Sequence, residues 1–225
     1  MSKTILIFAA HPDDETLGVG GTILWHKNKG DQVVVYIATD GVSARHDEKE
    51  FQKDAAKKAC SILGVDELIF GEFCDQQLDA MPLVTLAKAL SDIVVRVAPE
   101  VVYTQHFGDV NQDHRRLFEA TLIATRPVNN STIKEFYTYE VGSSTEWSVA
   151  IDGWTFKPNM YVDIAPYASQ KLKALECYCD TFESEIPPFP HPRSIEAVDN
   201  HGKKRGVEVG LFAAEAFCTI RLIRD

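Results

Sequence analysis

Residues 5–37 read ILIFAAHPDDETLGVGGTILWHKNKGDQVVVYI, and this stretch decides the fold. It begins with the continuous apolar run Ile5–Ala10, which predicts a buried strand. A helix-like stretch follows to about Asn28, Gly30 closes it, and the β-branched run Val33–Ile37 predicts a second strand. The glycines inside the helix indicate close packing against its neighbours. Fully apolar strands joined by a helix are typical of a parallel sheet that is covered on both faces.

The same alternation of strands and helices continues along the chain. We expect further strands at Glu67–Phe70, Val101–Thr104, Phe136–Glu140 and Met160–Ile164, and helices at Glu48–Leu63, Pro82–Val97, Arg115–Thr125 and Tyr167–Cys179. The proline-rich segment Ile186–Pro192 predicts a loop at a rim or lid, because stacked prolines fit neither a helix interior nor a sheet. The sequence therefore predicts one α/β domain over residues 1–225, with a Rossmann-like three-layer fold, a mostly parallel central sheet and helices on both faces.

Composition narrows the classes of protein to consider. The chain has 225 residues, 33 acidic and 23 basic, and a formal net charge of −10. With 45% hydrophobic and 25% charged residues it can bury a globular core, which excludes disorder, collagen and coiled coils. The acidic balance argues against a nucleic-acid partner, which normally needs a basic face. The first apolar run is too short for a membrane span and lacks a cleavage site, so we expect a cytoplasmic protein with no membrane partner.

The loop after the first predicted strand carries an unusual density of ionisable side chains. It reads His11-Pro12-Asp13-Asp14-Glu15, at the strand end where open α/β sheets bind their ligands. So many charges are costly together unless a cation compensates, and imidazole with carboxylate suits Zn²⁺ or a similar divalent ion. Neighbouring residues point in different directions, so we expect one of Asp13 and Asp14 to bind the metal and the other to handle a proton.

The loop after Val101–Thr104 carries a second such cluster. It contains His106 and continues through Asn111-Gln-Asp113-His114, with His114 at the start of a predicted helix. Asp113 is placed to orient a nearby imidazole, as carboxylates commonly do beside metal-binding histidines. The alternatives are that Asp113 caps the helix and that His106 is an ordinary loop histidine. Two dense His/Asp clusters at two strand ends of one sheet favour a metal site.

Two arginines and two tryptophans are weaker candidates. Arg45, in the loop after the second strand, and Arg193, beside the proline-rich segment, are candidates to bind a substrate hydroxyl or phosphate; a solvated surface position is the alternative for both. Trp147 and Trp154 fit stacking on a sugar ring, although core or interface packing is favoured. The segment 140–146 is a candidate for the pocket lining.

The first motif resembles a known family. Ala10-His11-Pro12-Asp13-Asp14-Glu15, followed by Gly18, Gly20-Gly21-Thr22 and the downstream Asp113-His114, is similar to the LmbE/PIG-L family of zinc-dependent sugar N-deacetylases. Supporting stretches that also resemble this family are Thr39-Asp40-Gly41, His191-Pro-Arg193-Ser194 and Ala214-Glu215-Ala216-Phe217. The resemblance implies that the zinc ligands are His11, Asp14 and His114, with Asp13 as the general base.

One departure from the family pattern concerns the second cluster. Many relatives have His-Pro-Asp-His, whose first histidine assists the tetrahedral intermediate, whereas this chain has Asn111-Gln-Asp113-His114. We name His106 as the candidate replacement and Asn111 as a neutral donor near the substrate.

The resemblance implies a metal-dependent hydrolase. It would remove the N-acetyl group from an N-acetylglucosamine-type sugar or conjugate, with a zinc-bound water as nucleophile and Asp13 as base. Ligand type discriminates poorly among first-row metals, so another divalent ion fits as well. A homo-oligomer is compatible with the resemblance. The alternatives are a catalytically degenerate module that binds a metal or a sugar nucleotide, and an amidase that acts on a non-sugar N-acyl substrate.

Overall fold

The structure is a computed structural model that describes residues 2–44, 49–128, 131–179 and 185–224. Its strands form one sheet in the order β3-β2-β1-β4-β5-β7-β6. The strands are β1 (Thr4–Ala9), β2 (Gln32–Thr39), β3 (Glu67–Phe73), β4 (Val101–Gln105), β5 (Glu135–Tyr139), β6 (Met160–Asp163) and β7 (Ala214–Leu222). From β3 to β5 neighbouring strands pair in parallel, and β7 runs antiparallel to both β5 and β6. This confirms the predicted mostly parallel sheet.

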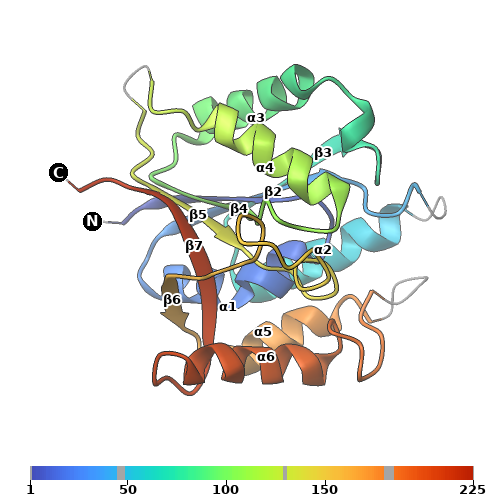
Figure 1. The fold of residues 1–225 in the computed structure, drawn as a ribbon, viewed down its shortest axis with the longest axis vertical. Helices are drawn as coiled ribbons and strands as arrows, with labels where there is room; N and C mark the ends of the chain where they lie inside the picture. Colours follow the sequence, from blue (N-terminus) through green and yellow to red (C-terminus); the bar gives the residue numbers. More distant parts are fainter. Residues whose placement is uncertain (1, 45–48, 129–130, 180–184, 225) are drawn as a thin grey trace.

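Helices cover both faces of the sheet (Figure 1). One face carries α1, α2, α5 and α6, and the other carries α3 and α4. Their bounds are α1 (Asp14–Asn28), α2 (Lys49–Leu63), α3 (Leu83–Val97), α4 (Gln112–Ala124), α5 (Ala168–Glu176) and α6 (Ile195–Val207), with a short 3₁₀ helix η1 (Leu78–Ala80). The three-layer α/β prediction is therefore confirmed. In the described part of the chain, every helix falls short of the length and apolar character that a bilayer crossing requires.

The central strand β1 shows why its sequence is apolar throughout. Ile5 and Ile7 belong to the core cluster beneath α1 and α2, and Leu6 and Phe8 belong to the cluster beneath α3 and α4. Successive side chains of a strand point to opposite faces, so a strand covered on both sides needs apolar residues at every position. Neither face of β1 is left for polar side chains, and they gather beyond its carboxyl end.

Helix α1 packs unusually close to its neighbours, as its glycines predict. A Cβ atom at Gly18 would lie 2.2 Å from the Tyr139 ring, and one at Gly21 would lie 2.6 Å from Ile164. These contacts exclude any larger residue without a shift of the surrounding structure. Close approach at these positions sets the distance between α1 and the strands β5 and β6.

Two elements near the C-terminus were not predicted. Helix α6 has a polar sequence with two internal glycines, so it lacks a continuous apolar stripe. Strand β7 is buried in its first half and partly exposed in its second half, which blurs the alternation expected of a strand. Both elements are held by their neighbours in the fold, α6 against α5 and β7 between β5 and β6.

Candidate metal centre and active site

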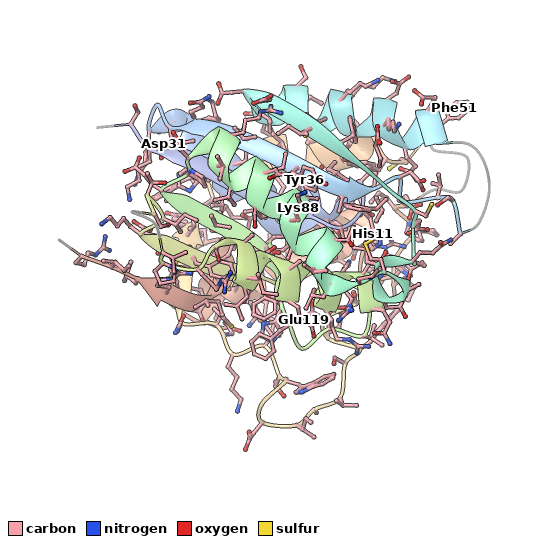
Figure 2. All side chains as sticks on the ribbon, turned by 90° about the horizontal axis from the view of Figure 1, so that it is seen from above. His11, Asp31, Tyr36, Phe51, Lys88 and Glu119 are labelled. Carbon is pink, nitrogen blue, oxygen red and sulfur yellow. The ribbon has the colours of Figure 1, made fainter. Side chains whose placement is uncertain are left out.

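The two His/Asp clusters meet at the carboxyl ends of β1 and β4. The strand order changes direction here, since β1 lies between β2 and β4, and such a switch point opens a crevice outside the sheet. His11 follows β1, and His114 stands in the first turn of α4 after β4. Figure 2 places His11 at one end of the sheet and Asp31 at the opposite end, with Tyr36 between them.

Three side-chain atoms form a nearly equilateral triangle in this crevice. His11 Nδ1 lies 3.3 Å from Asp14 Oδ2 and 3.3 Å from His114 Nε2, and the third side, His114 Nε2 to Asp14 Oδ2, is 3.4 Å. A tetrahedral Zn²⁺ with ligand distances of about 2.0–2.1 Å places any two ligand atoms roughly 3.3–3.4 Å apart. The donor types and the spacing both fit one such ion, with a fourth position left open.

A buried carboxylate contacts the outer nitrogen of His114. Asp109 Oδ2 lies 3.1 Å from His114 Nδ1. Asp109 is itself fixed by the hydroxyl of Thr145, at 2.8 Å, by the backbone N–H of Asn111, at 2.8 Å, and by the hydroxyl of Ser144. Such a carboxylate sets the tautomer of the imidazole, so that Nε2 carries the lone pair that a metal needs.

The outer nitrogen of His11 also faces carboxylates. His11 Nε2 lies 3.2 Å from Asp113 Oδ2 and 3.3 Å from Asp75 Oδ1. Asp113 accepts the backbone N–H groups of Gln76, at 2.8 Å, and Leu78, at 3.0 Å. The structure thus places Asp113 against an imidazole, as expected. The helix cap is a different residue, since Asn111 Oδ1 accepts the Asp113 N–H at 2.9 Å.

Carboxylates dominate the electrostatics of this site. Burial alone would lower the pKa of His114, but Asp14 and Asp109 outweigh burial and raise it to about 10. Asp113 and Asp14 likewise raise the pKa of His11 well above its ordinary value, against the effect of burial. Although burial raises the pKa of Asp14, the two histidines hold it well below its ordinary value. The crevice therefore stabilises positive charge, which is the kind of charge that a divalent cation would supply.

Asp13 lies next to Asp14 in sequence but has a different partner. Its φ of 113° belongs to a backbone region that non-glycine residues rarely adopt, and this turn lets the two carboxylates diverge. Asp13 Oδ2 accepts a hydrogen bond from Arg193 Nη1 at 3.1 Å. Burial raises the pKa of Asp13 well above its ordinary value, and Arg193 offsets part of that rise. Asp13 lines the same pocket as the three candidate ligands, and a buried carboxyl group with a raised pKa is a candidate to exchange protons.

These residues line a pocket of about 470 Å³, a volume typical of small-molecule sites. Its walls come from the loops after β1 to β5, including Val141–Ser144, and from Glu185 and Arg193 on either side of the proline-rich segment. Arg193 Nη1 also lies 3.2 Å from Glu185 Oε2, so the guanidinium bridges two carboxylates. Its Nε atom has no hydrogen-bond partner among the residues that the structure describes.

The structure brings His11, Asp13, Asp14, Asn111, His114 and Arg193 together around one pocket, whereas His106, Trp147 and Trp154 are not among the residues that line it. His106 is directed elsewhere: its Nε2 lies 3.0 Å from the Trp154 carbonyl oxygen and its Nδ1 lies 3.3 Å from Thr138 Oγ1, so both nitrogens are used outside the pocket. The alternative of an ordinary histidine fits this geometry, and the oxyanion role expected of His106 does not. Arg45 lies outside the described residues. Asn111 lines the pocket.

Sequence reasoning missed three acidic residues of the site. Asp109 lies between His106 and Asn111 in the second cluster, and its place after β4 was its one signal. Asp75 follows β3, in one of the strand-end loops where ligands are expected, but no neighbouring histidine marks it. Glu185 has no local signal, because its place at the pocket depends on the path of the proline-rich segment.

Comparisons with known proteins agree with this geometry. The family model described as PIG-L, GlcNAc-PI de-N-acetylase, matches residues 6–125. The uncharacterized deacetylase YaiS of Escherichia coli is 30% identical over 186 residues, which cover 77% of this chain and 89% of that protein. Diacetylchitobiose deacetylase of Thermococcus kodakarensis is 28% identical over 220 residues, 91% of this chain and 79% of that protein.

A solved structure matches at the level of the fold. N,N′-diacetylchitobiose deacetylase of Pyrococcus horikoshii superposes with a TM-score of 0.77 at 21% identity, covering 98% of this chain and 84% of that one. Together with a family match over more than half of the chain, these findings show that the protein belongs to the PIG-L/LmbE family.

Proposed function

We propose that this protein is a zinc-dependent N-deacetylase that acts on an N-acetylated amino sugar or a conjugate of one. The observation that carries the proposal is the triangle of His11 Nδ1, Asp14 Oδ2 and His114 Nε2, with sides of 3.3–3.4 Å, beside the carboxyl group of Asp13. The substrate class is taken from relatives that are named as deacetylases of acetylated sugars.

The chemistry divides between an ion and the protein. A Zn²⁺ held by the triangle would act as a Lewis acid toward an amide carbonyl and would lower the pKa of a coordinated water. Asp13 is the residue that moves the proton: its carboxylate takes a proton from the attacking water and gives it to the departing amine nitrogen. Arg193 holds Asp13 Oδ2 in place during both transfers.

Two further residues are proposed to contact the substrate. Asn111 uses its Oδ1 to cap α4, which leaves its amide nitrogen as a neutral donor at the pocket wall. Arg193 offers Nε, which is buried and has no partner within the described part of the chain, to a substrate oxygen. A buried donor of this kind is costly unless a ligand satisfies it.

The experiment combines metal analysis with an assay of acetate release. The purified protein is expected to contain about one zinc per chain and to release acetate from N-acetylhexosamine compounds in a chelator-sensitive way. Asp13→Asn should keep the metal and lose about 10²–10⁴-fold in turnover, because the proton carrier is removed. His114→Ala should lose both the metal and the activity. Asp54→Asn, on the exposed surface of α2, is the matched control.

The outcomes separate the alternatives. Normal turnover by either site variant overturns the assignment of residues. Zinc without acetate release from any acetylated sugar overturns the substrate class and favours another acyl amide. No metal and no activity favour a binding module that has kept the fold.

A further inference from the structure

The segment between β5 and β6 carries an exposed tryptophan that the proposed reaction does not use. Trp147 is 57% exposed, which is uncommon for a side chain with so much apolar surface. It follows the turn Val141–Ser144, whose residues line the pocket. Figure 2 shows this segment projecting from the body of the protein. An exposed indole beside a ligand pocket needs an explanation that packing of this chain alone does not supply.

Hydrogen bonds fix the turn that carries Trp147. Thr145 Oγ1 donates to Asp109 Oδ2 at 2.8 Å and accepts the Val141 N–H at 2.9 Å. Glu146 Oε1 accepts the Ser143 N–H at 2.6 Å. Asp109 is the carboxylate that contacts His114. The turn that precedes Trp147 is therefore tied to the same carboxylate that contacts a candidate metal ligand, which restrains the backbone from which the indole projects.

The other side of Trp147 meets the proline-rich segment. The indole and the His191 ring lie 6.0 Å apart, centroid to centroid, with their planes at 85°. His191 Nδ1 accepts the backbone N–H of Arg193 at 3.2 Å, and Arg193 reaches Asp13. Trp147 thus lies between the segment that carries Ser144 and the segment that carries Arg193, and Ser144 and Arg193 both line the pocket.

We propose that Trp147 is the platform on which a second sugar ring of the substrate stacks, an inference that rests on the proposed deacetylase function. A pyranose ring has an apolar face of C–H groups that packs on an aromatic ring, while its hydroxyl groups need polar partners at the edge. Trp147 offers the apolar face, and the His191 ring beside it offers polar nitrogen atoms. The pocket takes the N-acetylated ring and the indole takes the ring joined to it, so the substrate is at least a disaccharide.

The second tryptophan of this segment provides a matched control. Trp154 is 38% exposed, and the Arg115 guanidinium lies 5.5 Å from its ring. Its backbone carbonyl is used by His106, on the side away from the pocket. Trp154→Ala removes a comparable apolar surface from the same segment without touching the edge that Trp147 occupies.

The test compares kcat/KM for N,N′-diacetylchitobiose and for N-acetylglucosamine. We expect kcat/KM for the disaccharide, divided by kcat/KM for the monosaccharide, to fall about tenfold in Trp147→Ala. The fall should come from a higher KM for the disaccharide, because stacking contributes to binding in the ground state and the transition state alike. Trp147→Phe should restore most of the ratio, and Trp154→Ala should leave it as in the unaltered protein. A ratio unchanged in Trp147→Ala, or a fall of both kcat/KM values together, overturns the proposal.

Calorimetry separates this inference from the reaction itself. The disaccharide is titrated into zinc-loaded Asp13→Asn protein with and without Trp147→Ala. Trp147-dependent binding without acetate release from the unaltered protein would support the platform and overturn the deacetylase function. Acetate release by the unaltered protein, with disaccharide binding that does not depend on Trp147, would support the deacetylase function and overturn the platform. If the protein shows no acetate release and no disaccharide binding, both ideas are overturned.

Discussion

A buried ion pair against the middle of α1 gives a prediction whose size follows from the structure. Lys171 Nζ donates to Glu215 Oε1 and to the Leu17 carbonyl oxygen, both at 2.7 Å. The two oxygens of Glu215 accept the backbone N–H groups of Gly21, at 2.8 Å, and Thr22, at 2.7 Å. In a regular α-helix the Leu17 carbonyl oxygen accepts the Gly21 N–H. Here the same carbonyl also accepts Lys171 Nζ, and the same N–H also donates to Glu215, so the ion pair bonds directly to backbone groups of α1.

The perturbation is Lys171→Met, which keeps the length of the side chain and removes its charge. The side chains of Lys171 and Glu215 are 7% and 5% exposed, so the variant leaves a carboxylate buried without its cation. Breaking a buried pair in this way costs about 3–5 kcal/mol of unfolding free energy. For a chain of this size that corresponds to a fall in melting temperature of about 6–20 °C.

Chemical denaturation followed by circular dichroism measures the effect. Lys57→Met, which breaks an exposed pair with Asp54 on α2, should leave the midpoint unchanged. The double variant Lys171→Met/Glu215→Gln should be more stable than Lys171→Met alone, because it no longer buries an unpaired charge. If Lys171→Met unfolds at the same denaturant concentration as Lys57→Met, the pair does not support α1 and the reasoning is refuted.

Two further predictions concern Asp109, which contacts a candidate metal ligand, and Glu140, which follows β5 outside the pocket lining. Asp109→Asn should weaken zinc binding about 10–100-fold, because the carboxylate that orients His114 is lost. Competition with a chelator measures the zinc affinity, and an unchanged affinity would contradict the role assigned to Asp109. Although burial raises the pKa of Glu140, His201 and Arg205 lower it to about 2, from an ordinary value of 4.5, so the stability it contributes is complete above about pH 5 and is lost as the pH falls toward 2. A shift of this size corresponds to a contribution of about 3 kcal/mol to the free energy of unfolding. Glu140→Gln should flatten the acid side of a stability-against-pH curve, and an unaltered slope would contradict the assignment.

Topology explains why the candidate ligands could be predicted from the sequence. In a parallel sheet the carboxyl ends of neighbouring strands meet, so polar residues directly after β1 and β4 come together whatever the details of the helices between them. His11 and Asp14 follow β1 at once, and His114 begins the helix after β4. Proximity to a strand end was therefore enough to expect His11, His114 and one of the two adjacent aspartates in one crevice, whereas the choice of Asp14 came from the family resemblance.

The residues around the ligands could not be predicted in the same way. Asp75 reaches His11 from the loop between β3 and η1, and Glu185 reaches Arg193 from outside any helix or strand. His106 shows the opposite error. It follows β4 directly, but its ring is directed toward Trp154 and Thr138, because the path of the β5–β6 segment provides a carbonyl acceptor on that side.

The charge balance of the crevice connects the acidic composition of the chain to its chemistry. Asp14, Asp109 and Asp113 surround the two imidazoles, while Arg193 is directed to Asp13 and Glu185 rather than to this group. Carboxylates so close together favour positive charge among them, whether on the imidazoles or on a bound cation. The fold holds Asp14 and the two imidazoles as a triangle of the size that a tetrahedral ion requires, so the same excess of acid that argues against a polyanionic partner favours a divalent metal.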